Sequence, residues 1–154
     1  MRIRRSHQAA SLAALLVAGA LGAGCGGSDD NSTTATLSQS EYVAKATAIC
    51  KPANQRIEAA AHKYLGSGGP PTTQGFEQFA SASVIPETQN VIDALRGLTP
   101  PSDSAQAYDA LLAELQSVND RLEADPQALA QQGDPFAKAN QLAKQAGLDA
   151  CSSD

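Results

Sequence analysis

Two side chains whose types and spacing suit metal binding lie four residues apart in the first half of the chain. Glu58 and His62 would leave one face of a helix a turn apart, where a carboxylate and an imidazole can share a divalent cation. At about 100° per residue, however, His62 projects almost opposite the apolar stripe of its helix. The chain has no Glu-x-x-His or His-Glu-x-x-His motif. We therefore expect a solvated pair here, with no metal and no other cofactor.

Asn119 is the polar residue most out of place in the predicted core. It falls within an apolar stripe, flanked in helical projection by Leu115 and Leu122. A buried amide needs hydrogen-bonding partners, so two interpretations stay open. Asn119 could fix the register of its helix, or it could be the polar group of a small ligand cavity.

Other chemical constellations are weaker still. The acidic residues Glu114, Asp120, Glu123 and Asp125 lack the spacing and the Gly turn of a calcium loop. No Gly-rich phosphate loop follows a predicted strand, and one His remains once the N-terminal segment is removed. We expect a protein that is not an enzyme. The net charge of −5 has the wrong sign for binding nucleic acid through its phosphates.

The N-terminal segment predicts export from the cytoplasm. Arg2, Arg4 and Arg5 precede the apolar stretch 9–23, an arrangement typical of a signal peptide. This stretch is about fifteen residues long, shorter than the roughly twenty that span a bilayer. The Arg4-Arg5 pair leaves the twin-arginine route open beside the general one, although polar residues follow it where that motif has apolar ones.

The signal region ends in Leu21-Gly22-Ala23-Gly24-Cys25, which resembles the bacterial lipobox. In that motif small residues precede a Cys that is lipidated, for example with palmitate, and becomes the new N-terminus. Here the Leu stands one position earlier than usual. We expect lipid on Cys25 to hold the protein to the extracytoplasmic face of the cell membrane. The alternative is free secretion, with cleavage after Ala20 and Cys25 left as a thiol.

The remaining cysteines predict one disulfide. If Cys25 carries lipid, Cys50 and Cys151 form an even pair in an exported, oxidising setting. Their bond would close a loop of about 100 residues, which the loop-entropy model values at roughly 4–5 kcal/mol. A catalytic Cys would have only His62 as its partner, which makes that alternative much weaker.

The chain divides into three predicted regions: a signal peptide (1–24), a lipidated Cys with a flexible tether of small polar residues (25–37), and a helical domain (38–154). Within the helical domain, amphipathic helices position the residues discussed above. The first helix opens at a capping box, Ser38 to Glu41, and contains Pro52, where we expect a kink. The second follows Thr72 or Thr73 and is interrupted by Pro86, so one kinked helix and two short ones both remain possible.

The third helix opens at Ser102 or Ser104 and has the clearest apolar stripe of the chain. The fourth is broken around Gly133, continues over 135–146 and ends at Gly147. No segment alternates β-branched and polar residues as a half-buried strand would. The pattern predicts an all-α, antiparallel up-and-down bundle of three to four amphipathic helices with kinks at prolines.

Three stretches, 42–50, 95–101 and 146–151, resemble a family of small secreted or lipid-anchored helical proteins from actinobacteria. The resemblance covers nearly all of residues 41–151, although Pro52 is less usual for that family. It implies a helical bundle whose first and last cysteines are joined, and Cys50 and Cys151 match that pattern. It implies no activity, because the family is uncharacterised.

Two function hypotheses follow. The first is a non-enzymatic interaction or accessory module of the cell envelope, with a protein partner that the sequence does not identify. The second is a carrier that holds a small molecule or a lipid in a groove between helices near Asn119.

Overall fold

The structure is a computed structural model that describes residues 37–66, 70–131 and 133–153. The predicted signal peptide, Cys25 and nearly all of the predicted tether lie outside the described residues. The described part of the chain is all-helical, as predicted, with no strand. Its elements are α1 (Gln39–Leu65), α2 (Thr73–Phe79), a π-helical turn η1 (Ala80–Val84), α3 (Ile85–Arg96), α4 (Ser102–Ala124), a 3-10 turn η2 (Pro126–Ala130), α5 (Ala137–Gln145) and a 3-10 turn η3 (Asp149–Cys151).

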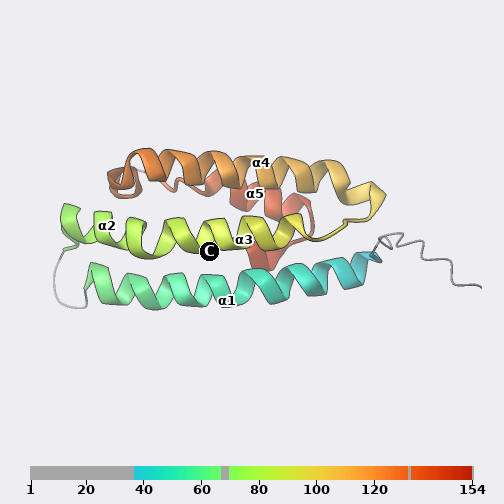
Figure 1. The fold of residues 1–154 in the computed structure, drawn as a ribbon, viewed down its shortest axis with the longest axis horizontal. Coiled ribbons are helices and arrows are strands. Elements are labelled where there is room, and N and C mark those ends of the chain that lie inside the picture. The colour runs from blue at the N-terminus through green and yellow to red at the C-terminus, as the bar shows by residue number, and fades with distance from the viewer. Residues whose placement is uncertain (1–36, 67–69, 132, 154) are drawn as a thin grey trace, which may run out of the picture. The chain divides into compact units, whose positions relative to one another are not determined.

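Three long helical rods run antiparallel in an up-and-down order, and they are α1, the α2–η1–α3 rod and α4 (Figure 1). The α3 helix packs between α1 and α4, and α5 packs on α4. After α5 the chain turns back, so that η3 packs on α1. The predicted bundle of amphipathic helices is therefore confirmed.

Helix α1 begins at the predicted capping box. The Ser38 hydroxyl accepts from the Glu41 amide, and the Glu41 carboxylate accepts from the Ser38 amide. The helix runs unbroken through Pro52, which is exposed. Tyr42 and Ala46 are fully buried on its inner face, because the apolar positions recur at helical spacing.

The second rod is continuous from Thr73 to Arg96, so Pro86 does not divide it into two separate helices. Its middle turn is π-helical, and the amide of Ile85 donates to the carbonyl of Ala80, five residues back. Proline has no amide hydrogen, and its ring crowds the carbonyl four residues earlier. A wider turn immediately before Pro86 relieves this crowding and lets the rod continue.

The last helix is short, with defined ends. Asp134 accepts from the Phe136 amide through its side chain, and the chain is broken before it at Gly133, as predicted. At the other end Gly147 has φ +72°, and the amides of Gly147 and Leu148 donate to the carbonyls of Lys144 and Ala143. These two bonds form a Schellman motif, which confirms Gly147 as the end of the helix.

The core has two apolar clusters. The larger one lies between α1, α3, α4 and α5, and its buried members are Tyr42, Ala46, Cys50, Ile92, Leu95, Tyr108, Leu111, Leu115, Ala139, Ala143, Ala146 and Leu148. The smaller one lies beside α2, η1 and the second half of α4, with Phe79, Val84, Val118 and Leu122 buried. Side chains of the α1 C-terminal half, such as Ile57 and Tyr64, pack on this second cluster but are only partly buried.

Candidate functional site

A cleft of about 520 Å³ lies between α1, the second rod, α4 and the C-terminal segment. Its volume falls in the range of roughly 300–1,000 Å³ that is usual for small-molecule sites. Seven of its lining side chains are aliphatic or aromatic: Ile57, Phe79, Val84, Val91, Leu115, Leu129 and Phe136. The polar ones are Asn54, Glu58, Thr88, Asn140, Ser152 and Ser153, and the Cys50–Cys151 disulfide completes the wall. The cleft thus has an apolar body with a polar margin.

The cleft exists because α5 is too short to cover α1. Helix α1 has 27 residues and α5 has 9. Over the middle of α1 the covering element is η3 with the residues that follow it. Phe136 and Leu129 approach from the irregular connection between α4 and α5 and close the cleft only in part, since both are half-buried.

The C-terminal segment Asp149–Ser153, here called the strap, forms one wall of the cleft. The predicted disulfide is confirmed, and it ties Cys151 of the strap to Cys50 of α1. The Asn54 side-chain amide donates to the carbonyls of Ala150 and Ser152, both at 3.2 Å. The strap is therefore held to α1 by one covalent and two hydrogen bonds.

Helix α5 holds the other side of the strap through Asn140. Its Nδ2 donates to the Ser153 carbonyl at 3.1 Å, and its Oδ1 accepts from the Ser153 amide at 3.0 Å. The same Nδ2 also donates to the Asp134 carboxylate at 3.0 Å. Asn54 and Asn140 thus clamp the strap from two helices, which fixes the position of this wall.

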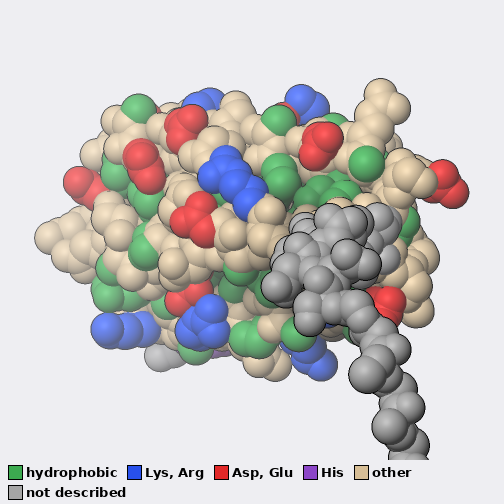
Figure 2. Space-filling view, turned by 45° about the vertical axis from the view of Figure 1, so that its right-hand side comes forward, with side chains coloured by type: hydrophobic (Ala, Val, Ile, Leu, Met, Phe, Trp, Pro, Cys, Tyr) green, Lys and Arg blue, Asp and Glu red, His purple; other side chains and the backbone are tan. Residues whose placement is uncertain are grey.

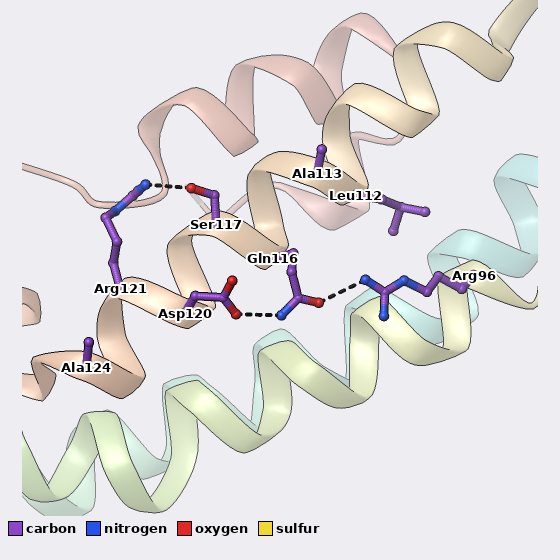
Figure 3. A pocket seen from close by; sticks show the side chains of 8 residues that line it. All are labelled: Arg96, Leu112, Ala113, Gln116, Ser117, Asp120, Arg121 and Ala124. Atoms are coloured by element: carbon purple, nitrogen blue, oxygen red, sulfur yellow. Dashed lines mark hydrogen bonds between the residues drawn. The ribbon is translucent and has the colours of Figure 1, made fainter.

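A second hollow, of about 570 Å³, lies on the surface of α4 (Figure 3). It is shallow and open to solvent, and its polar side chains bond to one another. Arg121 donates to Ser117, and Gln116 accepts from Arg96 while donating to Asp120. With its donors and acceptors used internally, this surface offers less for a ligand than the cleft does.

Asn119 is fully buried, as predicted, but it does not line the cleft. Its Nδ2 donates to Gln89 at 3.3 Å and to Glu123 at 3.2 Å, while its Oδ1 has no partner among the described residues. The bond to Gln89 links α4 to α3, whereas Glu123 lies one turn further along α4 itself, and the link between the helices favours the register interpretation over a ligand-binding one. The carrier hypothesis placed its groove near Asn119. The cleft lies instead around the disulfide, and Asn119 is not among its lining residues.

Glu58 and His62 are both exposed, which agrees with the predicted outward direction of His62. Within the part of the chain that the structure describes, no group of three or more His, Cys, Asp or Glu side chains is placed to hold a metal ion. Glu114 differs from the expected solvated face, because it is largely covered and pairs with Lys138 at 2.6 Å. Glu58 is nevertheless part of a site, since it lines the cleft.

Two tyrosines meet in the larger core cluster. The rings of Tyr42 and Tyr108 contact edge to face, with centroids 5.3 Å apart. The Tyr108 hydroxyl donates to the Leu95 carbonyl, whereas the Tyr42 hydroxyl has no partner within the described chain. Burial, and then the nearby Asp109 carboxylate, raise the pKa of Tyr108 to about 12. Burial raises the pKa of Tyr42 as well, so both phenols stay neutral near pH 7.

One ion pair joins α1 to α3 across the surface. Arg56 donates two hydrogen bonds to Glu87, at 2.7 and 2.8 Å, in a bidentate arrangement. These bonds hold the pKa of the Glu87 carboxyl below its usual value and raise the pKa of Arg56. On the face shown in Figure 2, acidic and basic side chains are interspersed, with no patch of one sign.

Sequence reasoning missed the cleft and most of its polar residues. Asn54 and Asn140 lie inside helices, where Asn is a poor former, and each hydrogen-bonds to the strap. The only sequence signal for these polar residues of the cleft was the position of the two asparagines next to apolar stripes. Their partner, the strap, could not be inferred from a local pattern.

Comparison of the chain with protein-family models, with curated proteins and with solved structures gave no match in any of the three. The resemblance to the actinobacterial family therefore stays a prediction from sequence. Among the described helices, none combines the length and the apolar character needed to cross a membrane.

Proposed function

We propose that this protein is an extracytoplasmic, lipid-anchored helical bundle that binds a small molecule with an apolar body in the cleft beside the disulfide. The observation that carries the proposal is the cleft itself, with its apolar body, polar margin and clamped wall. The lipobox-like segment ending in Cys25 supports the anchor. The sequence favoured an interaction module, but the cleft favours the carrier hypothesis.

The cleft offers binding rather than chemistry. Its cysteines are joined in a disulfide, and its one carboxylate, Glu58, is exposed to solvent. No His or Lys lies among the described residues that line it. Nucleophilic or acid–base catalysis would need a base beside an acid or a nucleophile. We therefore propose a carrier or receptor role and not an enzymatic one.

Ligand binding is tested with the neutral fluorescent probe N-phenyl-1-naphthylamine and the full-length protein. We expect saturable binding that Ile57→Trp weakens at least tenfold, because the indole fills the apolar part of the cleft. Ile49→Trp is the matched control, since Ile49 is a half-buried Ile of the same helix that does not line the cleft. Equal loss in both variants, or no saturable binding by the wild type, would refute the proposal.

The natural occupant and the anchor are tested together by native mass spectrometry of protein extracted gently from its own membranes. We expect a lipid mass on Cys25 and a reproducible small noncovalent mass. A second protein without a small molecule would refute the carrier in favour of the interaction module. A protein in the soluble fraction without lipid, unchanged by Cys25→Ala, would refute the anchor.

A further inference from the structure

We infer that the cleft is specific for a cationic amphiphile, namely a protonated amine attached to an apolar chain. The inference rests on the proposed function and names the ligand class of that same cleft. It is drawn from the hydrogen-bonding groups and charges that remain after the clamp on the strap has been formed.

The side-chain amide donors at the polar margin are already used within the protein. Asn54 donates both Nδ2 hydrogens to the Ala150 and Ser152 carbonyls. Asn140 directs its Nδ2 to Asp134 and Ser153. A carboxylate or phosphate ligand needs donors, and it could use these amides only by breaking their bonds to the strap and to Asp134.

The groups left for a ligand are acceptors. Among the described residues, nothing donates to Asn54 Oδ1 or to the Glu58 carboxylate. The Ser152 hydroxyl donates to the Asp149 carbonyl, so it too is engaged. The Thr88 hydroxyl can donate or accept and does not discriminate between ligands. The unused acceptors therefore favour a ligand whose polar part is a hydrogen-bond donor.

The charge at the polar margin also favours a cationic ligand. Glu58 is the one side chain with an ionisable group among the described residues that line the cleft. It lies one helical turn from Asn54, so its carboxylate and Asn54 Oδ1 share one side of the cleft. A second carboxylate, Asp134, is bonded to Asn140 just outside the lining. An ammonium group gains from this arrangement, and an anionic head group is repelled.

The apolar body of the ligand is defined by the apolar side chains of the lining. Phe79, Leu115 and Val84 are buried and belong to α2, α4 and η1, so three elements contribute one apolar floor. A linear alkyl chain needs no further polar contact there. The combination of apolar floor and acceptor margin matches an alkylammonium.

The test compares decylammonium, 1-decanol and decanoate by titration calorimetry at pH 7, below their aggregation concentrations. We expect decylammonium to bind about tenfold more tightly than decanoate, since attraction and repulsion at an exposed carboxylate are each worth up to about fivefold. Decanol should fall between them. Decanoate binding as tightly as decylammonium would overturn the inference but leave the proposed function intact. No binding of any of the three would overturn both.

Glu58→Gln removes the charge and preserves the shape of the side chain. We expect the preference for decylammonium over decanoate to fall to about twofold, with decanol binding unchanged. Glu77→Gln is the matched control, because Glu77 is exposed, lies on α2 and does not line the cleft. Both substitutions change the net charge equally. A comparable loss of preference in both variants would therefore mean that the overall charge of the protein, and not Glu58, determines the preference, and this would overturn the inference.

Discussion

The hydroxyl of Tyr42 is buried without a hydrogen-bond partner among the described residues. Since an unpaired buried hydroxyl is costly, Tyr42→Phe should raise the free energy of unfolding by up to about 1 kcal/mol. Tyr108→Phe is the contrasting variant, because it removes the bond to the Leu95 carbonyl and should lower stability by about 1 kcal/mol. Urea denaturation at pH 7 measures both. A loss in Tyr42→Phe equal to that in Tyr108→Phe would contradict the assigned contacts.

The Arg56–Glu87 pair makes stability depend on pH in a defined direction. Glu87 has a folded-state pKa below its ordinary value of 4.5, so the stabilisation is present above that value and is lost as pH falls through the folded pKa. Because the Arg56 side chain is 55% exposed, Arg56→Gln should lower the free energy of unfolding only slightly at pH 7.

Unfolding of wild type and Arg56→Gln is compared at pH 7 and at pH values below 4.5. The difference between the two proteins should shrink toward zero in acid. Glu87→Gln serves as the control background, in which adding Arg56→Gln should have little effect on stability, and the same effect at both pH values. A difference that persists in acid would assign the effect of Arg56 to packing.

At the scale of elements, α1 and α2 are in close contact at Gly75. A Cβ added there would lie 2.8 Å from the Tyr64 carbonyl oxygen, which belongs to the backbone and cannot rotate away. Gly75→Ala should therefore lower the free energy of unfolding by about 1–3 kcal/mol, despite the better helix propensity of Ala. Gln78→Ala, at an exposed position of the same helix, should be neutral or slightly stabilising. Thermal unfolding of the two variants distinguishes the steric effect of the added Cβ at position 75 from the effect of helix propensity.

The sequence predicted those elements whose signals are local. The capping box at Ser38, the stripe of α4 and the glycine end of α5 each depend on residues within a few positions, and all three are confirmed. The outcome at Pro86 could not be predicted, since a wider turn and a break both relieve a proline. In the structure all three parts of the rod pack on α1, and α3 also packs on α4, so the wider turn preserves contacts that a break would disturb.

The site was less predictable than the fold. Burial of Asn119 followed from its place in the stripe, but whether a cavity adjoins it depends on side chains from other helices. The cleft results from the short length of α5 and the path of the chain between α4 and α5, neither of which a local pattern determines. Glu58 was predicted to be half of a solvated pair rather than a metal ligand; it is exposed, and it also lines the cleft.

For the molecule as a whole, the disulfide joins residues separated by 101 positions. The double variant Cys50→Ala/Cys151→Ala should lose roughly 4–5 kcal/mol of unfolding free energy by the loop-entropy model. The variant should also bind the naphthylamine probe more weakly, because the strap then depends on Asn54 and Asn140 alone.

Guanidinium denaturation and probe titration measure the two effects, with the reduced wild type as a second form lacking the bond. Stability lost without any change in probe affinity would mean that the asparagine clamp suffices to hold the wall. Ser81→Ala, an exposed change away from the strap, should alter neither quantity.

The same bond determines how the molecule responds to mechanical force. When the chain is pulled by its two ends, tension passes from the first part of α1 through Cys50 into Cys151 and leaves at the C-terminus. Residues 51–150 lie inside the covalent ring and are bypassed, so α3, α4 and α5 are not stretched. Extension is limited to the chain outside the ring until the disulfide is reduced, after which the bundle can be unravelled.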